Sequence, residues 1–273
     1  MISLLIWSKD RACQLELLLR SLPKGLFFSV TTLYKTTSNE YQKGYDKLKE
    51  LYPEYFFINE DTNGGLEAQT RALITSSRDT KCKICLSTDD TVFYRQPSLT
   101  KEEIEQTITS DVCTFSFRYG LNTVMQNCHT GELQPSLNIY EDKGNYLRWN
   151  FDDYYPLSNY GYPFGLDMHV YDADLLFQLI NNIRFKNTNQ LESGLFNLRH
   201  IVPRIICAEK QSSAVNIPCN NMSGITIAGQ QFPFTIESLN QTFLDGYRIK
   251  LDNIMTTNII GSHQEIALEF EKS

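Results

Sequence analysis

Residues 83–95 have the sequence KICLSTDDTVFYR, and the rest of this 273-residue chain is best understood by starting from them. The first part is apolar like a buried strand, and the carboxylates of Asp89 and Asp90 follow directly. An apolar run resumes at Val92 and Phe93. Adjacent carboxylates at the end of a strand repel each other unless a cation neutralises their charge. Oxygen-rich sites suit Mg²⁺ or Mn²⁺, so the acid pair is either a metal site or a solvated turn between two strands.

The segments before the acid pair alternate between strand and helix patterns. Apolar runs predict strands over 2–7, 27–34, 55–58 and 83–88, and apolar residues at helical spacing predict helices over 15–22, 41–51 and 66–76. This alternation is typical of an α/β fold with a parallel sheet, which binds ligands beyond the carboxyl ends of its strands. The sequence has no G-x-G-x-x-G after the first strand and no G-x-x-x-x-G-K-[ST] motif, which argues against a dinucleotide site and a P-loop.

The pattern changes after Pro97. We expect a helix over 100–109, a strand over 112–117, an irregular segment over 118–165 and a helix over 172–183. Further on we expect strands over 204–207 and 266–270, an extended segment over 214–218 and a helix over 235–243. Residues 149–171 hold a concentration of aromatic side chains, which either stack on sugar rings or form a second core. No linker-like segment separates the two halves.

The composition limits the class of protein. A formal net charge of −7 argues against duplex nucleic acid as a partner, because phosphate binding needs a basic face. No apolar run is long enough to span a membrane, and residues 1–7 are too short for a signal peptide. The seven cysteines are an odd number and are expected to be thiols in a reducing compartment. We therefore expect a cytoplasmic location.

Several segments stand out together along the chain: LLIWSKDR (4–11), NGGLEAQTR (63–71), the acid pair, GLDMHVY (165–171), NQLE (189–192), VNIPCN (215–220) and HQE (263–265). As a series they resemble the GT-A-fold nucleotide-sugar glycosyltransferases, and the resemblance extends to the subgroup from bacteria and large algal viruses that builds surface glycans. It implies a single GT-A domain over 1–273 with a Rossmann-like, mostly parallel central sheet. Residues 1–97 would then bind the nucleotide-sugar, and the mixed half over 98–273 would bind the acceptor.

The same resemblance implies a metal-dependent transfer of a sugar, hexosyl or deoxyhexosyl, from a nucleoside-diphosphate sugar to a hydroxyl of a glycan. In this family a D-x-D motif holds the Mn²⁺ or Mg²⁺ that bridges the donor phosphates, and UDP is the commonest nucleotide. Here Thr88 stands in the place of the first Asp. Asp90 and His263 are the implied metal ligands, and Asp89 would contact the ribose or the donor sugar, although Asp89 and Asp90 could exchange these roles.

Other residues receive roles from the resemblance. The implied donor contacts come from six further residues: Ser8, Asp10, Arg11, Thr36, Asn63 and Arg71. An inverting enzyme also needs a general base, for which Asp167 and Glu192 are candidates, whereas a retaining enzyme would use neither in this role. Two of these residues also have a simpler structural interpretation. Arg71 would form an ion pair on the surface of its helix, and Glu192 would stabilise the helix dipole.

Two alternatives remain. A sugar-phosphate nucleotidyltransferase shares the sheet topology but normally carries a glycine-rich loop after the first strand, and residues 8–11 (SKDR) contain no glycine. A non-catalytic glycan-binding protein on a degenerate transferase fold would fit the replacement of the first Asp by Thr88.

Overall fold

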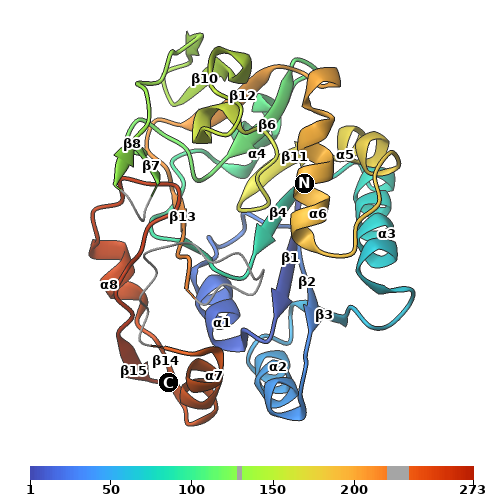
Figure 1. The fold of residues 1–273 in the computed structure, drawn as a ribbon, viewed down its shortest axis with the longest axis vertical. Helices are drawn as coiled ribbons and strands as arrows, with labels where there is room; N and C mark the ends of the chain where they lie inside the picture. Colours follow the sequence, from blue (N-terminus) through green and yellow to red (C-terminus); the bar gives the residue numbers. More distant parts are fainter. Residues whose placement is uncertain (128–130, 220–233) are drawn as a thin grey trace.

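The computed structural model describes residues 1–127, 131–219 and 234–273 (Figure 1). Within them, nine strands form one central sheet in the order β3-β2-β1-β4-β11-β6-β12-β10-β9. Asn220, the last residue of one of the segments that carry the family resemblance, lies outside the described residues, as does Cys128. The six cysteines that are described are buried free thiols.

The bounds of the elements are as follows. The central sheet contains β1 (Ile2–Lys9), β2 (Ser29–Lys35), β3 (Phe56–Asn59), β4 (Lys83–Thr88), β6 (Val112–Ser116), β9 (Glu141–Asp142), β10 (Tyr146–Asn150), β11 (His169–Asp172) and β12 (Ile205–Glu209). The helices are α1 (Ala12–Ser21), α2 (Asn39–Leu51), α3 (Gly65–Asp79), α4 (Lys101–Thr107), α5 (Ala173–Ile180), α6 (Thr188–Asn197), α7 (Ile236–Leu244) and α8 (Leu251–Thr256). Three small two-stranded sheets pair β5 (Thr91–Phe93) with β13 (Ala214–Asn216), β7 (Met125–Asn127) with β8 (Glu132–Leu133), and β14 (Tyr247–Ile249) with β15 (Phe270–Lys272).

The direction of the strands confirms the predicted fold class. Strands β3, β2, β1 and β4 are parallel neighbours. Strand β11 then lies antiparallel between β4 and β6, and β12 is parallel to β6. Of the described strands in this sheet, all except β10 and β11 run in one direction. The chain is therefore an α/β protein with a large, mixed, mostly parallel central sheet.

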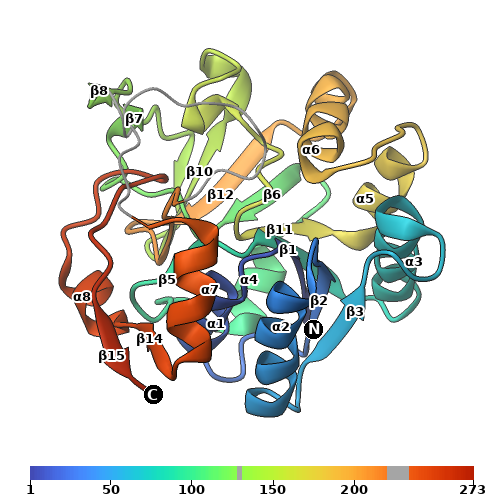
Figure 2. The same ribbon diagram turned by 60° about the horizontal axis from the view of Figure 1, so that its bottom comes forward.

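Alternate residues of β1 face two cores, which explains its continuous apolar sequence. Leu4 and Ile6 pack in the core that contains the buried side chains of α1, whereas Leu5 and Trp7 pack in the core that contains those of α3 and α5. Figures 1 and 2 show α1, α2 and α7 together on one face and α3 with α5 on the other. A strand covered by helices on both faces has no polar face, as expected for a parallel sheet.

The second half contains strands that the sequence patterns did not predict. Strand β10 falls within the segment expected to be irregular, and β11 falls just before the helix expected over 172–183, where no element was predicted. Along β10, Leu147 and Trp149 are buried while their neighbours are half-buried, which is a strand alternation. Near the end of the chain, the strand expected over 266–270 is wrong in its bounds, because the observed strand β15 begins only at Phe270.

Most of the aromatic side chains over 149–171 form a second core. Five of them are almost completely buried: Trp149, Phe151, Tyr160, Phe164 and Tyr171. The indole Nε1–H of Trp149 donates to the carbonyl of Tyr160 at 2.9 Å. Tyr155, in contrast, is 72% exposed. Of the two interpretations of this segment, the structure supports a packed core for these five rings.

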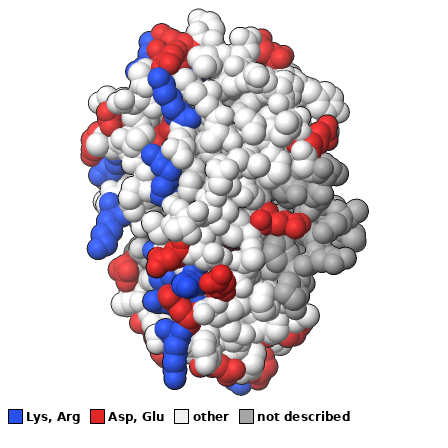
Figure 3. All heavy atoms as spheres, turned by 90° about the vertical axis from the view of Figure 1, so that its left-hand side faces the viewer, with Lys and Arg blue, Asp and Glu red and all other residues white. Residues whose placement is uncertain are grey.

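The outer face that carries α8 and the β7–β8 hairpin, at the left in Figure 1, is largely uncharged (Figure 3). Basic and acidic side chains alternate along one edge of this face. Around the hairpin, Val124 and Leu133 are exposed apolar residues. In the part of the chain that the structure describes, no helix combines the length and apolar character needed to cross a membrane.

Candidate functional site

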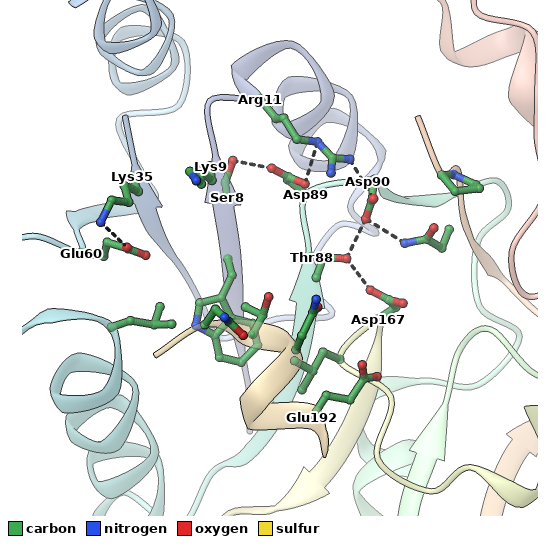
Figure 4. A pocket seen from close by; sticks show the side chains of 18 of the residues that line it. Ser8, Lys9, Arg11, Lys35, Glu60, Thr88, Asp89, Asp90, Asp167 and Glu192 are labelled. Carbon is green, nitrogen blue, oxygen red and sulfur yellow. Dashed lines mark hydrogen bonds and ion pairs between the residues drawn. The ribbon is translucent and has the colours of Figure 1, made fainter. Parts of the chain in front are cut away.

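A pocket of about 620 Å³ lies at the carboxyl ends of β1 and β4 (Figure 4). Its lining includes the loop after β1, the acid pair after β4, the start of α6 and His263. The predicted site residues among its lining are Ser8, Arg11, Asp89, Asp90, Asp167, Glu192 and His263. The position agrees with the expectation for an open α/β sheet.

The acid pair already has a cationic partner from the protein. Nε of Arg11 lies 3.3 Å from Oδ1 of Asp89, and Nη2 lies 2.8 Å from Oδ2 of Asp90. Asp89 is buried and also accepts a 2.7 Å hydrogen bond from the Ser8 hydroxyl. Burial raises the pKa of Asp89 to about 7, although the positive charge of Arg11 opposes this shift. The cation that the acid pair requires is thus supplied, at least in part, by Arg11.

Thr88 links the acid pair to a third carboxylate. Its hydroxyl lies 2.7 Å from Oδ1 of Asp90 and is also within hydrogen-bonding distance of Oδ1 of Asp167. A hydroxyl has one proton to donate, so it can satisfy only one of the two carboxylates at a time. Asn216, on β13, donates a further hydrogen bond of 2.8 Å to the same oxygen of Asp90.

Asp167 is held in its ionised form. Nη1 of Arg118 lies 3.3 Å from Oδ2 of Asp167, and Nε2 of His263 lies 3.6 Å from the same oxygen. Burial alone would raise the pKa of Asp167, but Arg118, His263 and the Thr88 hydroxyl together lower it well below its usual range. Asp167 therefore carries a negative charge across the ordinary pH range.

Backbone contacts fix the position of Asp167. Nε of Arg118 donates to its carbonyl at 2.8 Å, and Nδ1 of His169 lies 3.0 Å from the same oxygen. Burial, followed by the charge of Arg118, lowers the pKa of His169 to about 3, so its ring is neutral and Nδ1–H is the donor. The next residue, Met168, has a φ of +55°, an unfavourable backbone conformation for a residue with a side chain. These contacts hold the turn that leads into β11.

Glu192 lies in the second turn of α6 and lines the same pocket (Figure 4). The helix begins after Asn187, whose side chain accepts a hydrogen bond from the backbone N–H of Gln190. Burial of the Glu192 carboxyl, together with the negative charge of Asp167, raises its pKa to about 7, although the positive charge of Arg118 opposes this shift. The two candidate bases therefore have opposite electrostatic environments.

Two of the expected donor contacts, Asp10 and Thr36, do not line this pocket. The carboxylate of Asp10 is buried and accepts hydrogen bonds from the backbone N–H and the hydroxyl of Thr37, at 2.7 and 2.8 Å. It ties the end of β1 to the end of β2. The hydroxyl of Thr36 donates instead to Gln42 on α2 at 3.2 Å. In this arrangement both residues stabilise the rim of the sheet.

Asn63 and Arg71 also lie away from the pocket. Asn63 is exposed in the turn before α3, with a φ of +49°. The guanidinium of Arg71 points to the other side of α3, where it binds Glu67 at 2.7 Å and the carbonyls of Ile180 and Ile183 at 2.5 and 2.7 Å. The simpler reading of Arg71, an ion pair on its own helix, agrees with this geometry.

Arg118 and Asn216 are site residues to which the sequence patterns assigned no role. Arg118 lies shortly after the end of β6, so a search for polar residues beyond the end of every predicted strand would have found it. Asn216 lies in the extended segment over 214–218, and its pairing with Thr91 brings it beside the acid pair. Neither side chain has a sequence spacing that would reveal its partner.

The residues present fit a divalent cation that is shared with a ligand. Among the described residues, no three or more His, Cys, Asp or Glu side chains are grouped to enclose an ion by themselves. Mg²⁺, however, is usually held by one or two carboxylates together with substrate phosphates. Nη1 of Arg118, which can only donate, lies 3.1 Å from Nε2 of His263. A cation bound at His263 would therefore have to replace this contact with Arg118.

Comparison with known proteins relates the chain to a glycosyltransferase. No family model matches it. It is 26% identical over 199 residues to the bifunctional glycosyltransferase pgtA of Dictyostelium discoideum, an alignment that covers 67% of this chain and 25% of that protein. The chain thus corresponds to about a quarter of the length of this curated relative.

Solved structures show more distant similarity. TarS residues 1–349 of S. aureus share 15% identity, with 78% of this chain and 59% of that chain covered and a TM-score of 0.46. A 4-diphosphocytidyl-2C-methyl-D-erythritol synthase shares 10% identity, with 82% and 96% covered and a TM-score of 0.41. Because these scores are low, the fold assignment above rests on the order and direction of the strands.

Proposed function

We propose that the chain is a GT-A-type glycosyltransferase that transfers a sugar from a nucleoside-diphosphate sugar, with UDP the expected nucleotide, to a hydroxyl of a glycan acceptor. The observation that carries this proposal is the meeting of Asp90, Asp167 and Glu192 in one pocket beyond the end of β4. Sequence similarity to a glycosyltransferase supports the same reaction class. The sugar would be a hexose or a deoxyhexose.

Glu192 is the better general base of the two candidates. An effective base has a pKa near the working pH, and the pKa of Glu192 is about 7. Asp167 is a weak base because Arg118, His263 and Thr88 stabilise its ionised form. Its constant negative charge helps to keep the pKa of Glu192 high, so the two acids have separate roles.

The transfer then balances as a single displacement. Glu192 accepts the proton of the acceptor hydroxyl while the acceptor oxygen forms a bond to the anomeric carbon. The bond between that carbon and the diphosphate oxygen breaks, and the nucleoside diphosphate leaves with the bonding electrons. Because a base on the protein acts directly on the acceptor, the proposal is for an inverting enzyme.

Asp90 and His263 would hold the divalent cation. When bound, Mn²⁺ or Mg²⁺ supplies a Lewis acid that neutralises the charge developing on the leaving diphosphate. Asp90 is kept in place by Asn216, Thr88 and Arg11, so its carboxylate is oriented before any ligand arrives. Ser8 and Arg11, which line the pocket, are placed to contact the nucleotide.

Calorimetry and a turnover assay test the proposal together. The wild-type protein should bind UDP only in the presence of Mn²⁺, and Asp90→Asn should abolish that binding. Release of UDP from a panel of UDP-hexoses and UDP-deoxyhexoses should identify a donor. Unchanged UDP binding by Asp90→Asn would refute the assignment of Asp90 to the metal. If no donor were turned over while glycans still bound, the protein would be a non-catalytic binder.

A further inference from the structure

We propose that Arg11 controls the order of binding, so that a divalent cation binds tightly to this site only together with the donor diphosphate. The inference rests on the proposed function and adds a residue that regulates access to the metal site. In this mechanism Arg11 serves as the counterion of the acid pair until phosphate oxygens replace its carboxylate partners.

The position of Arg11 carries the inference. Its side chain is buried and lines the pocket, between the two carboxylates of the acid pair. A divalent cation bound to Asp90 would lie near a guanidinium whose Nη2 is 2.8 Å from Oδ2 of that residue. Two positive charges this close repel each other strongly in a buried site. The cation therefore competes with Arg11 for Asp90 as long as Arg11 stays in place.

The guanidinium is in contact with the acid pair but is incompletely satisfied by it. Nε and Nη2 of Arg11 are buried and lie at ion-pair distance from the carboxylates, yet neither nitrogen makes a hydrogen bond of acceptable geometry. Buried donors without a hydrogen bond are unfavourable. A diphosphate offers oxygens that match the planar fork of an arginine in two parallel hydrogen bonds. The donor can therefore draw the guanidinium away from the acid pair.

Both carboxylates of the acid pair have other partners, which remain when the Arg11 side chain moves toward the donor. Asp89 keeps the hydrogen bond from Ser8, and Asp90 keeps the hydrogen bond from Asn216 and its share of the Thr88 hydroxyl. The backbone of Arg11 is also fixed, because its N–H donates to the Tyr45 hydroxyl at 3.2 Å. Movement of the side chain alone would thus expose Asp90 to the cation without unfolding the loop.

Removal of the positive charge should change the affinities for cation and nucleotide in opposite directions. In Arg11→Gln, Mn²⁺ without nucleotide should bind at least about tenfold more tightly than in the wild type, because the repulsion is gone. UDP measured at saturating Mn²⁺ should bind at least about tenfold more weakly, because a charge-assisted phosphate contact is lost. Arg11→Lys keeps a positive charge and should leave Mn²⁺ binding without nucleotide close to that of the wild type.

The experiment measures Mn²⁺ binding by electron paramagnetic resonance, with and without UDP, in the wild type, Arg11→Gln, Arg11→Lys and Lys35→Gln. Lys35 is the matched control: it lines the same pocket, but its ammonium pairs with Glu60 at 3.1 Å and Asp61 at 2.9 Å instead of the acid pair. Its replacement should leave Mn²⁺ affinity without nucleotide unchanged. Circular dichroism establishes that each variant is folded, and Arg11→Lys provides a comparison if Arg11→Gln is unstable.

The outcomes separate this inference from the proposed function. If the wild type binds Mn²⁺ with UDP but Arg11→Gln shows no gain in affinity for Mn²⁺ alone, the inference is wrong and the proposed function stands. If Arg11→Gln is unstable, the wild type and Arg11→Lys are compared instead. The inference is then wrong if each of these two proteins binds Mn²⁺ with the same affinity in the presence and in the absence of UDP. If the wild type binds no Mn²⁺ even with UDP, the metal dependence in the proposed function fails and the inference fails with it.

Discussion

Thr88 and Asp167 face each other across the pairing of β4 with β11, and the hydroxyl of the first hydrogen-bonds the carboxylate of the second. The same hydroxyl is also 2.7 Å from Asp90, so it separates two carboxylates that would otherwise repel each other. The family resemblance implies a carboxylate at this position. With Thr88 there, the site carries one negative charge fewer than that pattern would give it.

Thr88→Val should destabilise the protein when divalent cations are absent. The valine has the same shape but no hydroxyl, so Asp90 and Asp167 lose a shared donor, and we expect a loss of about 1–2 kcal/mol in the free energy of unfolding. Urea denaturation with EDTA measures this loss. Thr88→Ser retains the hydroxyl and should resemble the wild type. Equal stability of the valine and serine variants would show that the hydroxyl has no such role.

Glu192→Gln should lower kcat by about 10²–10⁴-fold while leaving UDP binding unchanged, since the amide cannot accept the proton. For the wild type, kcat should rise as the pH increases through about 7 and then level off, because the ionised form of Glu192 is the active base. A pH profile with the identified donor measures both. Ser193→Ala, an exposed change on the same helix, should have no effect. If kcat instead depended on Asp167 and not on Glu192, the roles of the two acids would have to be exchanged.

Arg71→Ala should reduce stability without weakening nucleotide binding. Arg71 connects α3 to the end of α5 through Glu67 and two backbone carbonyls, so we expect a loss of about 1–3 kcal/mol. Arg184 also pairs with Glu67 but is 85% exposed, and Arg184→Ala should lose less. Thermal unfolding and UDP titration measure the two properties. A loss of UDP affinity in folded Arg71→Ala would instead support the hypothesis, implied by the family resemblance, that Arg71 contacts the donor.

The same ion pair predicts a pH dependence of stability. Burial opposes ionisation of Glu67, but hydrogen bonds from Arg184 and Arg71 outweigh it and lower the pKa from 4.5 to about 2. A carboxyl whose pKa is depressed on folding stabilises the protein above its unfolded pKa, and this contribution is lost as the pH falls through the folded value. Glu67→Gln should therefore be less stable than the wild type at pH 7, and the difference should shrink between about pH 4.5 and pH 2. A constant difference over this range would contradict the linkage.

Trp149→Ala should cost about 3–5 kcal/mol of stability, because it opens a cavity in a packed aromatic core. Tyr155→Ala, on the exposed part of the same segment, should leave stability within about 0.5 kcal/mol of the wild type. Chemical denaturation distinguishes the two. A stable Trp149→Ala variant with weakened glycan binding would instead support the interpretation of this ring as a sugar platform.

The first 90 residues could be predicted well because the central strands β1 and β4 are largely apolar and the apolar residues of α1 recur at helical spacing. Strand β11 could not, since its four residues merge with the apolar pattern of α5 and its partners β4 and β6 lie far away in the sequence. The sequence could indicate that Asp89 and Asp90 need a cation. It could not indicate that Arg11 lies between them, because Arg11 is far from the acid pair in the sequence. Apolar periodicity predicts elements, whereas the partners of polar side chains depend on how distant elements meet.

The pairing of β11 with β4 has a consequence for how such a protein can diversify. His169 pairs with Leu86 and Asp172 with Lys83, and the same ladder extended by two residues brings Asp167 opposite Thr88. The acid is therefore positioned by the sheet and by Arg118, and not by the rest of the long segment over 118–165 that precedes it. Changes in the length of that segment beyond Arg118 should therefore leave Asp167 in register with Thr88. A single residue inserted between Asp167 and His169 would have the opposite effect, because it would displace the acid from its place opposite Thr88.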